Sequence, residues 1–308
     1  MPLDNVKLKD IKPALCGYIR DAQLMLDRGK VPGEKTVHDV RVLMKKSRAS
    51  IKLLKTQMDE TSYKREYSTL REVGRIMQSW RETSVHRKLL KDLKKKHPGL
   101  FSHLTDIEKI NALLIKPVII SEPSPEMKKG LESINELLHK SGYRLRFTAM
   151  NNLDPNMLFR ELEITYISVS DCFLRARNYQ KSINLHELRK KTKDFLYQLV
   201  FFRSLKPGAI KNLEKKLEAM GQNLGKYNDH AVLINTLGYK YHSGENSSAF
   251  DELIVIIKQE QDKYLSRVWP SAYRIFRPGQ KLANVLGLKV PPTPGEGPDS
   301  YRDRERYF

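Results

Sequence analysis

The chain has 308 residues, enough for one large domain or two of ordinary size with a buried core. It carries 56 Lys and Arg residues against 36 Asp and Glu residues, a formal net charge of +20 at pH 7. A charge of this size indicates a polyanionic partner, such as nucleic acid, an acidic membrane surface or a phosphate polymer. The hydrophobic fraction of 40% and the charged fraction of 30% exclude an intrinsically disordered chain.

The two cysteines, Cys16 and Cys172, stand alone in the sequence. Neither belongs to a CxxC pair or to a Cys and His spacing typical of zinc sites, so the sequence supports neither a disulfide framework nor a structural zinc ion. The N-terminal residues lack the apolar core of a signal peptide, and no run approaches the ~20 apolar residues that span a membrane. We therefore expect a soluble, cytoplasmic protein.

Apolar residues recur every three or four positions through eight segments, and this period indicates amphipathic helices. Short runs containing Gly, Pro, Asn or His separate the segments and predict turns. Strand-like alternation is brief, as at residues 116–120. The sequence therefore predicts an all-α fold built from antiparallel helical bundles. The predicted helices cover residues 8–28, 36–58, 66–94, 126–140, 156–178, 185–203, 209–237 and 249–276.

An internal repeat divides the chain. The residues from His38 to Lys45 match those from His186 to Lys193, 148 positions later, and both read His, acid, aliphatic, Arg, any three residues, Lys. A second match aligns Leu70-Arg-Glu-Val-Gly74 with Gly221-Gln-Asn-Leu-Gly225 at an offset of 151. Two matches in the same order at nearly the same offset predict two similar structural units.

We therefore expect one helical domain over residues 5–280, formed by two pseudo-symmetric antiparallel four-helix bundles. The first bundle covers residues 5–152 and the second covers residues 153–280. The remaining residues 288–308 are rich in Pro, Gly and charge, a composition that predicts a tail without fixed structure.

The first repeated helix, residues 37–56, carries its basic residues on one side. At ~100° per residue these side chains fall within about 100° of arc, and aliphatic residues take the opposite side. No acidic residue occurs between Asp39 and Asp59. Like charges four residues apart disfavour an isolated helix by about 0.2–0.5 kcal/mol per pair, so the stripe has a cost that a simple solvated face would not explain. The stripe consists of His38, Arg41, Lys45, Arg48, Lys52 and Lys55, opposite Val40, Leu43, Met44, Ile51 and Leu54.

The second repeated helix has a shorter stripe with Asp194 at its edge. If the two repeats pack about a pseudo-twofold axis, the two stripes converge on one basic groove. Arginine can bind phosphate oxygens in bidentate fashion, lysine supplies a mobile charge, and a histidine beside an anion gains a proton. The stripe consists of His186, Arg189, Lys190, Lys193 and Tyr197, opposite Leu188, Phe195 and Leu199.

At these residues the sequence resembles the CHAD family, the conserved-histidine α-helical domain. The first helix is similar to the family's H-x-x-R-V-x-x-[RK]-[RK]-x-R signature, the second to its L-H-x-x-R-K-x-x-K-x-x-x-Y signature, and residues 224–229 to its L-G-x-x-[NR]-D element. Leu196 and the pair Met77-Gln78 depart from the family pattern, which often has Arg and Arg-Asp there. The matched positions are His38, Arg41, Val42, Lys45, Lys46 and Arg48, then Leu185, His186, Arg189, Lys190, Lys193 and Tyr197.

The resemblance covers about residues 5–280 and implies two pseudo-symmetric helical bundles around a basic central groove. It implies that this groove binds inorganic polyphosphate, with no cofactor and no established catalysis. It further suggests a cytoplasmic protein associated with polyphosphate granules. The polyphosphate-binding residues that we predict are His38, Arg41, Lys45, Lys46, Arg48, Lys52, Lys55, His186, Arg189, Lys190, Lys193 and Tyr197.

Two alternatives concern the histidines. The His38-Asp39 pair also occurs in helical metal-dependent phosphohydrolases of the HD type, but adjacent helix residues point about 100° apart, so a dyad alone builds no metal site. The second copy carries Glu187 in place of the Asp, and its neighbouring cations would repel a metal ion. A structural role, with each His satisfied by a neighbouring polar group, remains open.

Nucleic-acid binding is the stronger alternative to polyphosphate. Residues 87–99 form a basic run with little aromatic content, which is also typical of a solvated helix end. No helix-turn-helix or zinc-finger signature is present, so we expect at most loose electrostatic binding to DNA or RNA at low salt. Stacking of single strands would need exposed aromatic residues, for which Tyr63, Tyr67, Tyr179, Tyr227 and Tyr241 are candidates.

Overall fold

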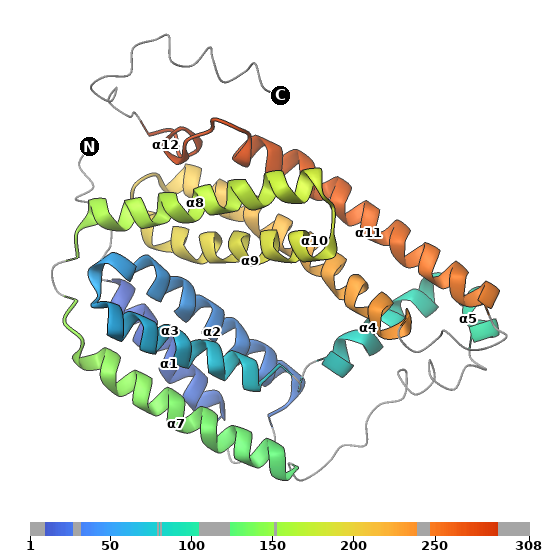
Figure 1. The fold of residues 1–308 in the computed structure, drawn as a ribbon, viewed down its shortest axis with the longest axis horizontal. Helices are drawn as coiled ribbons and strands as arrows, with labels where there is room; N and C mark the ends of the chain where they lie inside the picture. Colours follow the sequence, from blue (N-terminus) through green and yellow to red (C-terminus); the bar gives the residue numbers. More distant parts are fainter. Residues whose placement is uncertain are drawn as a thin grey trace.

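The computed structural model describes residues 10–26, 32–78, 80, 82–104, 124–150, 153–238 and 247–288. Within these ranges the chain is helical and contains no strand, which confirms the predicted all-α class (Figure 1). Residues 116–120 and residues 289–308 of the predicted tail lie outside the described residues.

The first group of helices includes the first and the last helix of the predicted first bundle, residues 5–152. It consists of α1 (Ile11–Leu26), α2 (Glu34–Leu53), α3 (Glu60–Ile76) and α7 (Pro125–Phe147). Helices α1 and α3 each pack on both α2 and α7, so the four helices close a ring. A short 3-10 turn, η2 (Lys55–Gln57), follows α2 directly.

The second group lies above the first in Figure 1 and closes in the same way. It consists of α8 (Pro155–Asn178), α9 (Ser182–Leu199), α10 (Pro207–Gly238) and α11 (Ser247–Phe276). Helices α8 and α10 each pack on both α9 and α11, and α2 packs on α9 to join the two groups. A pseudo-twofold relation between the groups stays a prediction. The short elements η3 (Val200–Phe202) and α12 (Leu282–Val285) follow α9 and α11.

The prediction of one continuous helix over residues 66–94 was wrong. Helix α3 ends at Ile76, where the N–H of Gln78 bonds to the carbonyl of Arg75 and so tightens the last turn, and α4 (Glu82–Lys96) begins a new direction. The apolar period runs through the break in the sequence, but its two parts face different cores. Val73 packs in the main core, whereas α4 and α5 (Pro98–Leu104) pack on α10 and α11.

The helices that leave the first group form a second, smaller core. It lies at the far end of α10 and the start of α11, on the right of Figure 1. The buried residues of this core are Leu90, Leu93, Leu100 and Phe101 from α4 and α5, with Leu233, Leu237, Leu253 and Ile257 from α10 and α11.

The apolar sides predicted for the two repeated helices are confirmed. In α2, Val40, Met44, Ile51 and Leu54 are at most 1% exposed, and Leu43 packs against the same core. In α9, the buried side carries Leu188, Phe195 and Leu199. Burial of these side chains is what holds each stripe of cations on the opposite side of its helix.

Several helices begin where the sequence supplies a capping residue. The side chain of Asp59 accepts a hydrogen bond of 2.8 Å from the N–H of Ser62 at the start of α3, and this bond lowers the pKa of that carboxyl group. Ser124 and Asp154 cap α7 and α8 in the same way. Each of these two is followed by a proline, which the first helical position favours because it needs no N–H there.

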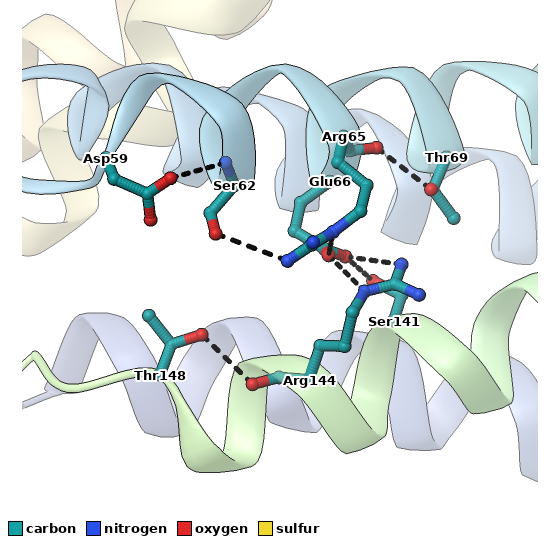
Figure 2. A network of polar contacts seen from close by, with 8 residues as sticks. All are labelled: Asp59, Ser62, Arg65, Glu66, Thr69, Ser141, Arg144 and Thr148. Atoms are coloured by element: carbon teal, nitrogen blue, oxygen red, sulfur yellow. Dashed lines mark hydrogen bonds and ion pairs between the residues drawn. The ribbon is translucent and has the colours of Figure 1, made fainter.

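A buried carboxylate fixes α3 against α7 (Figure 2). The side chain of Glu66 is 1% exposed and accepts a hydrogen bond of 2.7 Å from the hydroxyl of Ser141. Arg144 of α7 donates to both carboxylate oxygens, and Arg65 donates to one of them at 3.1 Å. The charge of Glu66 is therefore compensated in the interior, which is the condition for burying an ionised group at moderate cost.

We expect Glu66→Gln to lower the free energy of unfolding by about 3 kcal/mol, because it leaves Arg144 and Ser141 without the carboxylate that they bind. Urea unfolding followed by circular dichroism measures this change. The control is Glu60→Gln on the same helix, where the Glu and its partner Lys64 are exposed. We expect its free energy of unfolding in urea to change by less than about 1 kcal/mol. Equal stability of both variants would contradict a structural role for Glu66.

Candidate anion-binding site

The two repeated helices touch at their C-terminal halves. The side-chain amide of Gln198 in α9 donates a buried hydrogen bond of 3.0 Å to the carbonyl of Ala49 in α2. Close by, the Lys52 ammonium lies 2.5 Å from a carboxylate oxygen of Asp194. In Figure 1, α2 and α9 both run from right to left, converge at these ends and diverge towards their N-termini. The helix axes therefore form a V with its apex at Lys52 and Asp194.

The two histidines of the repeated helices lie on the diverging parts of this V. His38 is in the second turn of α2 and is exposed, and His186 is in the second turn of α9 and is half-buried. The structure thus separates the two histidines and joins the far ends of the two stripes.

In α2 the stripe faces α3 over much of its length. Arg41 is half-buried and donates a hydrogen bond of 2.8 Å from Nη1 to the carbonyl of Gly74 in α3. Lys45 and Arg48 are half-buried along the same side, and Lys55 is exposed in η2 beyond the end of the helix. The cations of the α2 stripe are therefore exposed at its two ends and half-buried between them.

Lys46 lies apart from this row. Its ammonium stands 5.5 Å from the ring centroid of Tyr18 in α1, on a different side of α2 from Arg41. The family signature includes this position, but the helix turns it towards α1. The structure therefore does not bring Lys46 together with the other cations of the stripe.

In α9 the cations lie against two glycines of α10. A Cβ atom on Gly221 would stand 2.7 Å from Cε of Lys193, and one on Gly225 would stand 3.1 Å from Nε of Arg189. Two glycines four residues apart in a helix interior cost stability, about 1 kcal/mol each relative to alanine. Here they make room for the guanidinium group of Arg189 and the end of the Lys193 side chain. Sequence reasoning aligned these glycines with the repeat but missed this role, although their i,i+4 spacing was a signal.

The arginine contacts of the two repeats correspond. Arg41 and Arg189 occupy matching positions of the repeat, and so do Gly74 and Gly225. Each arginine lies against the matching glycine of the following helix, α3 in one half and α10 in the other. The two contacts differ in kind, because Arg41 bonds to the carbonyl of Gly74, whereas the Arg189 guanidinium lies where a Cβ atom of Gly225 would stand. The repeat therefore matches in the position of the two arginines and not in the details of their contacts.

The remaining predicted residues of α9 surround this pair. Lys190 is exposed and lies 3.4 Å from a carboxylate oxygen of Glu187. Tyr197 is half-buried, with the Lys193 ammonium 6.0 Å from its ring centroid. Burial raises the pKa of Tyr197. Its hydroxyl group therefore stays protonated at neutral pH and can act as a hydrogen-bond donor.

Partial burial and mutual repulsion destabilise the charged forms in this row. Burial lowers the pKa of Lys193, and the nearby charge of Arg189 lowers it further, against a smaller opposite effect of Glu218. Burial likewise lowers the pKa of His186, with Lys190 acting in the same direction and a hydrogen bond with Asn228 acting against both. An anion placed beside these groups would relieve the repulsion that they exert on one another.

Other features of the described residues lie elsewhere or are absent. No group of three or more His, Cys, Asp or Glu side chains within the described ranges could hold a metal ion. A shallow depression lined by Gln23, Asn135, Glu136, His139 and Lys140 lies between α1 and α7, away from both stripes. Among the helices described, none is both long and apolar enough to cross a membrane.

A family model for the CHAD domain matches residues 20–238 of the chain. The protein belongs to the CHAD-domain family. The match begins within α1 and ends with the last residue of α10, so it contains both repeated helices and both glycine contacts. It leaves α11 and α12 outside, whereas the resemblance in the sequence was expected to extend to residue 280. No match to a curated protein was found.

We expect the imidazole of His186 to titrate below its ordinary pKa of 6.5, because burial favours the neutral ring. The unfolded chain then binds more protons in acid than the folded chain does. This contribution to stability is present above pH 6.5 and is lost as the pH falls through the folded pKa. An NMR titration of the histidine rings, with His186→Gln used to assign the signal, measures the midpoint. A midpoint at or above 6.5 would contradict the burial of this ring.

We expect Gly221→Ala to displace Lys193 from α10 without unfolding the protein, because the added methyl group meets only the far end of a flexible side chain. The pKa of Lys193 then rises towards its ordinary value of 10.5 as the ammonium becomes hydrated. Carbon NMR of the lysine Cε signals measures this change. In the control, Gly208→Ala on the same helix, the new Cβ meets nothing within 4 Å. An unchanged Lys193 signal in Gly221→Ala would refute the contact.

Proposed function

We propose that this CHAD-domain protein binds inorganic polyphosphate along the cation rows of α2 and α9 and catalyses no reaction on it. The observation that carries the proposal is the repeated position of Arg41 and Arg189, which are both half-buried and both next to a glycine of the following helix. Membership of the CHAD family supports polyphosphate as the polyanion.

The chemistry of the row suits a flexible chain of phosphates. Polyphosphate presents charged non-bridging oxygens on every phosphate, and a row of cations on a helix offers a charge at nearly every turn. Partial burial strengthens each contact between an ion and its partner, because the local dielectric constant is lower than in water. Arg41 and Arg189 would bind oxygens in a fixed fork, and Lys193, one turn beyond Arg189 on α9, would add a mobile charge.

The proposed site is narrower than the set of residues expected from the sequence. It excludes Lys46, which lies against Tyr18 of α1, Lys52, whose ammonium is bound to Asp194, and Lys55, which lies in η2 beyond the end of α2. The proposed contacts come from His38, Arg41, Lys45 and Arg48 on α2, and from His186, Arg189, Lys190, Lys193 and Tyr197 on α9.

Competition between polyanions tests the choice of ligand. Fluorescent long-chain polyphosphate is displaced by unlabelled polyphosphate, by duplex DNA or by RNA at physiological salt. We expect polyphosphate to compete at least about tenfold better by phosphate equivalent, because the row offers no groove-reading helix and few aromatic platforms. Equal displacement by all three would leave a generic polyanion-binding surface. Phosphate release in the presence of Mg²⁺ or Mn²⁺ would contradict the absence of catalysis.

Charge reversal tests the site. We expect Arg41→Glu with Lys193→Glu to weaken polyphosphate binding about 100-fold or more and to reduce the dependence of the affinity on salt by about two phosphate contacts. The matched control is Lys258→Glu with Arg274→Glu, which changes the net charge equally at exposed positions of α11. Fluorescence anisotropy at several salt concentrations measures both effects. Equal losses in the two double variants would show that net charge, and not this row, determines binding.

A further inference from the structure

Asp194 is the acidic residue of the α9 stripe, and it lies where the two stripes meet. Its carboxylate accepts a hydrogen bond from the Lys52 ammonium at 2.5 Å. The side chain of Asp194 is 18% exposed and that of Lys52 is 29% exposed, so water screens this pair only in part. The pair thus places a carboxylate of the protein itself against a cation of the predicted phosphate row.

The surroundings of the pair hold it in place. The Lys52 ammonium also stands 5.6 Å from the ring centroid of Tyr67, which stacks on Tyr63 at a centroid distance of 6.0 Å. Burial lowers the pKa of Lys52, but the charge of Asp194 and its hydrogen bond outweigh this effect and raise it overall. Lys52 therefore stays charged and bound at neutral pH.

A second acid lies beyond this pair, on α8. Burial raises the pKa of Glu161, while a hydrogen bond with Thr56 and the charge of Lys55 act in the opposite direction. Lys55, the last cation expected in the α2 stripe, is thus within the electrostatic reach of a largely buried carboxyl group. The diverging part of α9 also carries an acid, Glu187, which lies 3.4 Å from Lys190, but the side chains of that pair are more exposed, at 42% and 55%. The less exposed pair of an acid with a cation of the stripes lies at the apex of the V.

A phosphate chain that reached Lys52 would have to take the place of Asp194. The displaced carboxylate would remain half-buried beside the phosphates, since α9 holds its backbone against α2 through Gln198 and Ala49. The negative charges of Asp194 and of the phosphates would then repel each other in a partly dehydrated site, and Asp194 would lose its partner Lys52. The carboxylate of Glu187, by contrast, is more exposed and can turn into solvent when a phosphate approaches Lys190.

We propose that Asp194 is a specificity-determining residue that ends the phosphate row at the junction of α2 and α9 by retaining Lys52. This inference rests on the proposed function of the two rows. Bound polyphosphate then contacts Arg41, Arg189 and Lys193 and stops short of Lys52. The Asp194 carboxylate therefore limits the number of phosphates that one protein molecule contacts.

The test removes the charge of Asp194 and keeps its shape. Asp194→Asn frees Lys52, and we expect the affinity for long-chain polyphosphate at physiological salt to rise about tenfold. The salt dependence of that affinity should steepen by about one phosphate contact. Adding Lys52→Met to this variant should cancel both gains. The control, Asp171→Asn at an exposed position of α8, changes the net charge equally and should leave both quantities unchanged.

A measurement on the unaltered protein covers the case in which Asp194→Asn fails to fold. Saturation with polyphosphate should shift the NMR signal of the Lys193 ammonium and leave that of Lys52 in place. A shift of the Lys52 signal equal to that of Lys193 would overturn the inference.

The outcomes separate the two proposals. If polyphosphate binding depends on Arg41 and Lys193 but Asp194→Asn leaves affinity and salt dependence unchanged or lowers the affinity, only the role of Asp194 is wrong. If the reversal of Arg41 and Lys193 has no more effect than its control on α11, the proposed function fails and this inference fails with it.

Discussion

The contact between α2 and α9 is the constraint on which the arrangement of the two halves depends. It combines a fully buried amide, Gln198, which bonds to the backbone of α2, with an ion pair that is only partly screened from water. A buried amide that loses its acceptor costs about 1–3 kcal/mol, so the bond fixes the axial position of one helix on the other. The two helices meet at their C-terminal halves and diverge towards their N-termini, so that the cations of their outer turns lie on two separate arms.

Those cations are held at partial burial by the shape of the neighbouring helices. Glycine at two successive turns of α10 lets the end of the Lys193 side chain and the guanidinium group of Arg189 lie along the helix backbone. A long side chain on a flat surface loses less entropy on binding a ligand than one that moves freely in solvent. The two glycines thus lower the stability of the fold, but they order the cations before any anion binds and so reduce the entropy lost on binding.

The sequence predicts the parts of this design that depend on helical periodicity alone. The 3.6-residue period separates Val40 and Met44 from Arg41 and Lys45, and burial in the structure follows that separation. The period does not reveal where a helix bends when its apolar residues continue, and for this reason the break after Ile76 was missed. Nor does it say which neighbour a side chain meets. The orientation of Lys46 towards α1 and the pairing of Asp194 with Lys52 both depend on how helices distant in the sequence pack.

The excursion of α4 and α5 makes the two halves of the chain inseparable. These helices leave the first group and complete a small core whose other wall is the outer part of α10 and α11. A chain divided near residue 152 would therefore present Leu90 and Phe101 to water in one fragment and Leu233 and Ile257 in the other. Helices α4 and α5 of the first half thus cover the outer part of α10 and α11 in the second half, as in a segment exchange within a single chain. The burial of this second core therefore requires both halves of the chain.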